Sequence, residues 1–503
     1  MNLPVIAPVL LPLLAGILLL LLPQTRPDWQ RTLSVIAVAT QIGLALALMV
    51  LVSPGDILVY ALGNWPAPFG IVLVADRLAA WMLVITALLA LCALLYALGG
   101  ADRSGRYFHV LFQLQLFGLN GAFLTGDLFN LFVFFEILLL ASYGLLLHGG
   151  GRQRIRAGLH FVVINLAGST LFLFAAGALY GVLGTLNMAD LALKVAAAPP
   201  ENVPLVRAAG LLLFAVFALK AALLPVYLWL PAAYAQTSAP VAALFAIMTK
   251  VGAYSILRVY TLIFGPEASA AANLLEFWLL PLALATLLVG MIGAVASASL
   301  RQQAAYLVVA SVGSLLTALG LNSHAGIAAG LYYLPHSTFA TAALFLLADL
   351  IARQRGVLED RLDPGPDLPD SRLLGGLFFI TAIAVIGLPP LSGFLGKFLL
   401  LQAALDHPFL PWLMGSVLIA ALLGIIALAR TGSLLFFHVE PITAPSAPRL
   451  SMRTDLAPLI GLLLLVFGLT IGAGPVLDQS RAIAGQLVEP QHYIQAVLTP
   501  GGR

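Results

Sequence analysis

The sequence predicts an all-α, polytopic membrane protein with about fourteen transmembrane helices. Charged residues make up 9% of the 503 residues, against roughly 25% in an average soluble domain, and hydrophobic residues make up 61%. Apolar runs of about 20 residues recur along the chain, and each is long enough to cross a hydrocarbon core of about 30 Å as a helix. These observations exclude a soluble enzyme, a nucleic-acid-binding protein and a disordered chain.

The expected spans follow the apolar runs, and short polar or Pro- and Gly-containing segments separate them. No Lys or Arg precedes the first run and no small-residue cleavage site ends it, so we interpret it as a span and not as a signal peptide. The segment 475–503 is too short and mixed for a further span and is expected to form an interfacial helix or a tail. The spans are 3–23, 32–52, 74–98, 108–125, 127–147, 159–184, 207–230, 240–263, 275–297, 303–321, 326–350, 374–404, 411–438 and 454–474.

The distribution of Lys and Arg predicts the orientation, because cytoplasmic loops carry the excess of these residues. Loops after odd-numbered spans hold fourteen: Arg26, Arg31, Arg103, Arg106, Arg152, Arg154, Arg156, Arg301, Arg353, Arg355, Arg361, Arg372, Arg449 and Arg453. Loops after even-numbered spans and the tail hold four: Lys194, Arg207, Arg481 and Arg503. This bias places both termini on the extracytoplasmic side.

Besides Arg430, which we interpret as structural, five ionisable residues lie deep inside the expected spans, where a charge costs at least about 2.5–3.5 kcal/mol. At 1.5 Å per helical residue, Glu136, Lys250 and His336 fall near the midplane of the membrane. Lys220 and Lys397 lie beside prolines that interrupt their spans. All five must face the interior of the helix bundle and have a partner or water there.

The two interrupted spans predict an internal repeat. Pro225 follows Lys220, and Pro389 and Pro390 precede Lys397 five spans later. Two discontinuous helices at corresponding positions are typical of inverted repeats around a transport site. We therefore expect residues 1–106 to form spans 1–3, 107–263 a first five-helix repeat (spans 4–8), 275–438 a second, inverted repeat (spans 9–13), and 439–503 span 14 and the tail.

The chemistry of these residues indicates proton transfer. A buried lysine can release a proton when its carboxylate partner moves away, and histidine titrates near neutral pH. A row of Glu136, Lys220, Lys250, His336 and Lys397 at one depth can therefore relay protons laterally. Ser311 and Thr338 are candidates to fill the gap between Lys250 and His336, and Asp349 is a candidate proton mouth.

Purely structural interpretations stay open for several of these side chains. Glu136 and Lys220 can be a buried ion pair without a transport role, and His336 a core histidine hydrogen-bonded to a neighbouring helix. Lys397 can anchor its broken helix through carbonyls that the break leaves free. No cofactor or metal is expected, because Cys92 is the only cysteine and no nucleotide, dinucleotide or zinc motif has a suitable context.

Four motifs resemble those of antiporter-like membrane subunits. The stretch Thr125-Gly-Asp127-Leu-Phe-Asn130 through Glu136 resembles the fifth-helix motif of that family, and its form is nearest the D-type subunit of the Mrp-type multisubunit sodium/proton antiporter. The other three motifs resemble the broken seventh helix, the eighth helix and the broken twelfth helix of the family. They are Leu219-Lys220 through Pro231, Thr249-Lys250 through Arg258, and Gly387-Leu-Pro389-Pro390 through Lys397.

The resemblance implies a bacterial inner-membrane protein that works with other membrane subunits, without a cofactor of its own, and that moves protons and a monovalent cation, expected to be sodium. By motif match, Glu136 and Lys220 would form the coupling pair, Lys250 the central relay and Lys397 the terminal proton-transfer group. The alternative is an antiporter-like pumping subunit of a complex I-type oxidoreductase or a membrane-bound hydrogenase. Ala232-Ala233-Tyr234 departs from the acidic residue and histidine that many relatives carry there, which argues against the complex I subunits nearest that pattern.

Overall fold

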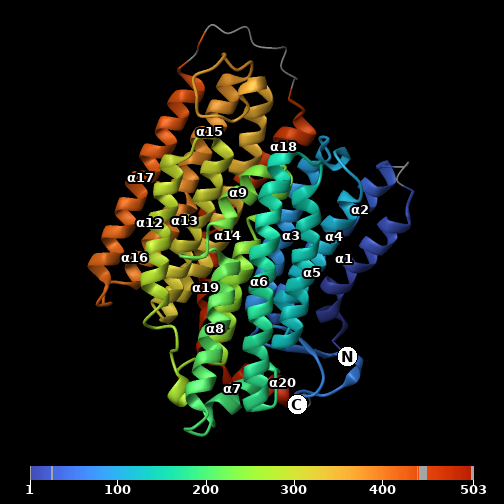
Figure 1. Ribbon diagram of the computed structural model, residues 1–503, viewed down its shortest axis with the longest axis vertical. Coiled ribbons are helices and arrows are strands. Elements are labelled where there is room, and N and C mark those ends of the chain that lie inside the picture. The colour runs from blue at the N-terminus through green and yellow to red at the C-terminus, as the bar shows by residue number, and fades with distance from the viewer. Residues whose placement is uncertain (1, 24–26, 439, 441–449, 500–503) are drawn as a thin grey trace.

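The structure is a computed structural model that describes residues 2–23, 27–438, 440 and 450–499 (Figure 1). It confirms the helical class, with one addition: part of the expected loop 53–73 forms an antiparallel hairpin of β1 (Leu58–Ala61) and β2 (Val72–Ala75). The helices are α1 (Leu3–Leu21), α2 (Pro27–Val52), α3 (Arg77–Ala97), α4 (Phe108–Leu124), α5 (Leu128–Leu147), α6 (Arg152–Leu183), α7 (Met188–Ala196), α8 (Val203–Ala221), α9 (Trp229–Gln236), α10 (Ala239–Phe245), α11 (Met248–Leu262), α12 (Leu279–Ala296), α13 (Leu300–Gly320), α14 (His324–Arg355), α15 (Ser371–Ile386), α16 (Ser392–Ala403), α17 (Leu410–Phe436), α18 (Ala457–Ile471), α19 (Ala473–Val488) and α20 (Gln491–Leu498). Short turns η1 (Leu62–Asn64), η2 (Ala101–Arg103), η3 (Ser269–Ala271), η4 (Gly356–Leu358) and η5 (Met452–Leu456) join some of them.

Twelve helical segments of the described ranges are long and apolar enough to cross a membrane, and α4 and α15 are shorter apolar helices. The predicted count of about fourteen spans is close to these twelve segments, but the exact count stays a prediction. The division at 107–263 and 275–438 and the inverted relation of the two repeats also stay predictions.

The long helix α14 runs through the centre of the bundle, and α11, α13 and α14 are almost wholly buried (Figure 1). The outer helices α2, α6 and α17 bury only 33–39% of their apolar stretches, and the other side chains there are partly or fully exposed. An exposed apolar face as long as a membrane-spanning helix is typical of contact with lipid or with another membrane protein. The bundle therefore has a buried centre in which polar groups can be kept from lipid.

Both predicted helix breaks are present. At the first break, α8 ends before Pro225 and α9 begins at Trp229. At the second break, Pro389 and Pro390 separate α15 from α16. A third break, between α10 and α11 at residues 246–247, lies inside a span that we expected to be continuous. Side chains satisfy the carbonyls at these points: the Trp229 indole donates to Leu219 O at 3.0 Å, and the Tyr234 hydroxyl donates to Phe245 O at 2.7 Å.

Inside α14, a side-chain donor likewise replaces a backbone hydrogen bond that a proline removes. Pro335 has no N–H and cannot donate to Leu331 O, the carbonyl four residues earlier in the helix. The Trp81 indole of α3 donates to that carbonyl instead, at 3.3 Å. The residue after Pro335 is His336, so this altered turn of α14 carries one of the predicted site residues.

Ion pairs join loops that were predicted to share one side of the membrane. Arg31 and Asp102 are 2.6 Å apart, Arg301 and Asp360 are 3.2 Å apart, and Arg353 and Asp455 are 2.9 Å apart. Each pair links loops or span ends of the odd-numbered set. Arg26, Arg449 and Arg503, which also entered the orientation argument, lie outside the described residues.

The opposite end of the bundle holds both ends of the described chain. Asn2 donates to Val59 O of β1 at 3.1 Å, and α20 packs against β1 and α7 (Figure 1). The predicted C-terminal tail is therefore helical. One part, α19, follows α18 after a change of direction at Gly472 and packs along α14.

Candidate functional site

One helix, α6, lies between the predicted coupling partners Glu136 and Lys220. The Ser169 hydroxyl of α6 donates to a Glu136 carboxylate oxygen, and the Lys220 ammonium lies 3.2 Å from the Asn165 side-chain oxygen, one turn away on the same helix. Among the ion pairs of the described residues, none joins Glu136 to Lys220. The expected direct pair is therefore separated by two neutral polar side chains.

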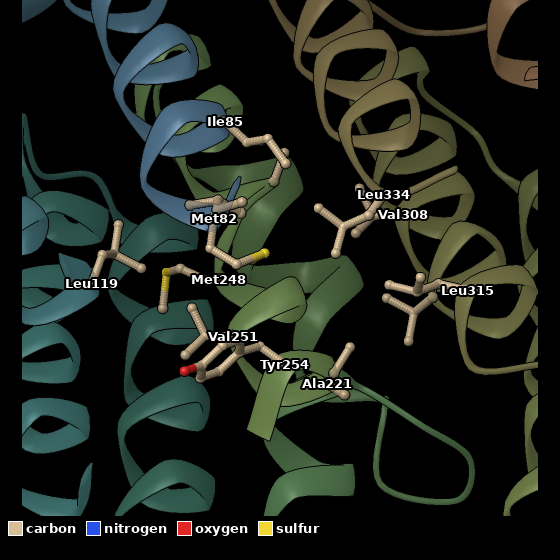
Figure 2. Packing of buried hydrophobic residues seen from close by; sticks show 14 of the residues in the cluster. Met82, Ile85, Leu119, Ala221, Met248, Val251, Tyr254, Val308, Leu315 and Leu334 are labelled. Atoms are coloured by element: carbon tan, nitrogen blue, oxygen red, sulfur yellow. The ribbon is translucent and has the colours of Figure 1, made fainter. Parts of the chain in front are cut away.

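The side chain of Lys250 is completely buried near the start of α11, just after the break at residues 246–247. Its ammonium donates to the Ser311 hydroxyl of α13 at 3.2 Å, and that hydroxyl donates to Val308 O at 2.7 Å. Figure 2 shows part of the apolar core to which α11 belongs: Met248 and Val251 of α11 lie in the same buried cluster as Met82 and Leu119. Ser311 thus contacts Lys250, and its predicted role in linking Lys250 to His336 stays a prediction.

The ring of His336 bridges α14 to both halves of the broken helix α15–α16. Its Nε2 lies 3.1 Å from Ala384 O of α15, and its Nδ1 lies 2.9 Å from the Ser392 hydroxyl of α16. Both His336 and Ser392 are buried. The approach depends on a glycine, because a Cβ added at Gly393 would lie 2.5 Å from Nε2.

The Lys397 ammonium donates to Ile386 O, the last residue of α15, at 2.5 Å. Lys397 belongs to α16 and is buried, so this bond crosses the break at Pro389–Pro390. The geometry matches the anchoring interpretation that the sequence left open. Anchoring and proton transfer are compatible, because a lysine ammonium has three N–H groups and this bond uses one.

Two predicted supporting residues have other contacts. Thr338 donates to Leu334 O of its own helix at 2.8 Å, and its predicted role between Lys250 and His336 stays a prediction. Asp349 lies 2.6 Å from Arg353 and accepts from the Tyr96 hydroxyl at 2.8 Å. Asp349 is therefore part of a polar cluster at the end of the bundle where the odd-numbered loops lie.

The sequence analysis missed the neutral partners Asn165, Ser169 and Ser392. Asn165 and Ser169 are spaced i, i+4 on an otherwise apolar span, and that spacing could have indicated a shared polar face. Arg258 ends one of the four motifs, and the sequence analysis named no partner for it. The structure shows Arg258 buried and paired with Asp76 at 2.6 Å.

The helices that carry these groups are packed in sequence across the bundle: α5 on α6, α6 on α8, α8 on α11, α11 on α13, α13 on α14 and α14 on α16. The five ionisable side chains and their neutral partners thus lie on helices that pack in succession, and a continuous lateral line through them stays a prediction. Among the described residues, no group of three or more His, Cys, Asp or Glu side chains could hold a metal ion. The line suits transfer of protons between amines, hydroxyls, amides and an imidazole.

Comparison with known proteins identifies relatives of this architecture. A family model described as "NADH:quinone oxidoreductase/Mrp antiporter, TM" matches residues 125–424. The D-type subunit of a probable K(+)/H(+) antiporter of Rhizobium meliloti (strain 1021) is 42% identical over 469 residues, 88% of this chain and 86% of that protein. The D-type subunit of a Na(+)/H(+) antiporter of Alkalihalophilus pseudofirmus is 37% identical over 502 residues, 99% of this chain and 100% of that protein.

A solved structure agrees with these matches over the whole chain. One chain of the Mrp complex from Dietzia sp. DQ12-45-1b superposes with a TM-score of 0.88 at 30% identity, covering 99% of this chain and 100% of that chain. The match extends over both broken helices and over the helices that carry the buried line of polar groups. The chain therefore belongs to the NADH:quinone oxidoreductase/Mrp antiporter family of membrane proteins.

Proposed function

We propose that this protein is the proton-translocating subunit of a multisubunit cation/proton antiporter. The observation that carries the proposal is that Glu136, Lys220, Lys250, His336 and Lys397 lie on helices that pack in succession across the bundle, and that all of them except the half-buried Glu136 are buried. Each of these side chains has a polar contact on a neighbouring helix. A protein that only needed stability would gain little from such groups, because buried charges are often replaceable by apolar side chains.

In the proposed mechanism, protons move laterally between these groups. Lys220 lies on one side of α6 and Glu136 on the other, so the charge on Glu136 influences Lys220 across Asn165 and Ser169. A proton released from Lys220 passes to Lys250, then to His336, and reaches Lys397 at the far end. The protein has a transport role and not an enzymatic one, and other membrane subunits complete the assembly.

The exported cation is proposed to be sodium. Relatives named for K(+)/H(+) and for Na(+)/H(+) exchange are both similar to this chain over most of its length. Vesicles that contain the whole complex can be energised and then given Na⁺ or K⁺ in turn, with dissipation of the pH gradient as the readout. Exchange with K⁺ alone would overturn the choice of sodium and leave the proton path intact.

The central test replaces Lys397 with alanine. We expect Lys397→Ala to abolish cation/proton exchange in vesicles while the subunits still co-purify in mild detergent. Lys194→Ala is the matched control, because Lys194 is exposed and pairs only with Asp190 on the same helix. Normal exchange in vesicles that carry Lys397→Ala would refute the proton path.

A redox-driven pump is the second candidate, because the family model covers NADH:quinone oxidoreductases as well as Mrp antiporters. Co-purification separates the two: iron–sulfur and quinone-binding subunits indicate the pump, and small membrane subunits alone indicate the antiporter. A third possibility, a scaffold whose ion path lies in a partner, predicts that Glu136→Ala and Lys250→Ala leave exchange intact.

A further inference from the structure

The Ser392 hydroxyl lies between the His336 ring and a carbonyl of α18. We propose that Ser392 is a positioning residue that reorients its hydroxyl, so that the buried His336 can be neutral or protonated without movement of the surrounding heavy atoms. This inference rests on the proposed function, since only a proton-carrying histidine needs both states. It separates that role from the structural core histidine that the sequence left open.

The contacts of the ring assign which nitrogen gains and loses the proton. Nε2 faces Ala384 O at 3.1 Å, and a carbonyl can only accept a hydrogen bond. Ala384 O is available because the helix is ending there: Leu388 N donates to Ile383 O, and Ala384 O receives only a tight-turn bond from Gly387 N at 3.0 Å. Nε2 therefore carries hydrogen in both states, and Nδ1 is the nitrogen that titrates.

The Ser392 hydroxyl has two partners, and each suits one state of Nδ1. In the neutral state the hydroxyl donates to Nδ1, 2.9 Å away. In the protonated state Nδ1–H donates to the Ser392 oxygen, and the hydroxyl turns to donate to Val466 O, 3.1 Å away. A rotation about one C–O bond therefore accommodates the gain or loss of one proton.

Thr470 gives the Val466 carbonyl a side-chain donor that does not depend on Ser392. Its hydroxyl donates to Val466 O at 3.0 Å, so that oxygen still has a side-chain donor when Ser392 turns away. The same hydroxyl accepts from Ser392 N–H at 2.9 Å and fixes the backbone of Ser392 in place. Neither state leaves a buried polar atom of this group unpaired, which would otherwise cost about 1–3 kcal/mol.

Besides Ser392, few side chains influence the protonation of the His336 ring. The charged side chains that act on His336 are Lys397 of α16 and Lys250 of α11, and the Tyr333 ring of α14 lies 5.8 Å away. Of the elements packed around it, α18 has no ionisable residue and α15 has only Arg372, at its opposite end. The hydroxyl of Ser392 is thus the neutral group that responds directly to the proton on Nδ1.

The test measures the pH dependence of exchange by the whole complex in vesicles. Ser392→Ala removes the acceptor of the protonated ring, and a hydrogen bond to a charged group is worth more than one to a neutral group. We expect the limb of the pH profile that depends on protonated His336 to move to lower pH, by about one pH unit. Thr470→Val should move this limb to higher pH, because Val466 O then competes with the neutral ring for the Ser392 hydroxyl.

Ser337→Ala is the matched control, since Ser337 is a buried serine next to His336 whose hydroxyl donates only to Leu334 O of its own helix. We expect its profile to match that of the unaltered protein. If Ser392→Ala assembles and its profile also matches, the inference is overturned. If Ser392→Ala does not assemble, Thr470→Val decides, and an unshifted limb overturns the inference.

A histidine variant distinguishes failure of this inference from failure of the proposed function. Wild-type exchange in vesicles with His336→Gln would remove His336 from the proton path and so overturn both. Impaired exchange in His336→Gln with unshifted profiles in Ser392→Ala and Thr470→Val would overturn only the role of Ser392.

Discussion

A buried charge pair outside the proposed proton path gives a prediction about stability. Arg258 contacts both carboxylate oxygens of Asp76, at 2.6 and 2.8 Å, and both side chains are buried. Asp76 also accepts from Ala79 N at the start of α3. Removal of one partner leaves the other as an uncompensated buried charge, which typically costs about 3–5 kcal/mol.

We therefore predict that Arg258→Ala strongly lowers the thermal stability of the purified complex. Arg481→Ala is the control, because the Arg481–Asp478 pair is exposed and 3.5 Å apart, and such pairs contribute about 0–1 kcal/mol. Both variants can be followed by thermal unfolding in the same detergent. Equal unfolding temperatures for the two variants would contradict the buried-pair argument.

Asp102, in the loop between α3 and α4, predicts a pH dependence of stability. Burial raises the pKa of this carboxyl, but hydrogen bonds from His109 and Arg31 outweigh that effect and lower the pKa from 3.8 to about 2. A carboxyl with a depressed pKa in the folded state stabilises the protein above its unfolded pKa, and this stabilisation is lost as the pH falls through the folded value. The unaltered protein should be more stable than Asp102→Asn above about pH 4, and the difference should shrink toward pH 2. A difference independent of pH across that range would show that the charge of Asp102 is not responsible.

At the scale of single residues, the sequence predicted the charged side chains of the candidate site but missed the neutral side chains that contact them. Glu136, Lys250 and Lys397 could be found because charge inside an apolar run is rare and costly. Ser392 could not, because neutral polar residues are common in membrane helices, and only the i, i+4 spacing of Asn165 and Ser169 indicated a polar face there. Which carbonyl or ammonium they contact depends on how two distant helices pack.

At the scale of helices, side-chain donors satisfy the backbone wherever a buried helix is interrupted. Trp229, Tyr234, Trp81 and Lys397 each donate to a carbonyl that a break or a proline leaves available. An unpaired carbonyl at that depth would be unfavourable, because neither water nor lipid would satisfy it. The sequence marked the breaks that contain proline, but residues 245–247 of the α10–α11 break contain none, so that break was missed.

The Trp81–Leu331 contact gives a prediction about the proline in α14. Trp81→Phe keeps an aromatic ring but leaves Leu331 O without a donor, which should cost about 1–3 kcal/mol of stability. In a Pro335→Ala background the same substitution should cost much less, because the backbone N–H of residue 335 can then donate to Leu331 O. The four proteins form a double-mutant cycle that thermal unfolding can measure. Equal effects of Trp81→Phe in both backgrounds would mean that the indole does not replace the missing backbone donor.

At the scale of the whole molecule, the charge bias and the ion pairs agree on which loops share an end of the bundle. Arg31, Arg301 and Arg353 each contact an acidic residue from another loop or span end of the same set. The sequence could predict this grouping because helices that cross a membrane in turn must alternate in direction. It could not predict the hairpin of β1 and β2, since these strands are short and depend on contacts with the ends of other helices, and it left open whether the tail is helical.

The side of the membrane on which each end lies can be tested with engineered cysteines, because Cys92 is the only native one. In a Cys92→Ser background, Ser104→Cys places an exposed thiol in an odd-numbered loop, and Gln495→Cys places one on α20 at the other end. Lys and Arg are enriched in cytoplasmic loops, so Ser104→Cys should react with a membrane-impermeant maleimide only in inverted vesicles. Gln495→Cys should react in spheroplasts. The reverse pattern would invert the predicted orientation, and reaction of both thiols from one side would contradict the placement of the two positions at opposite ends of the bundle.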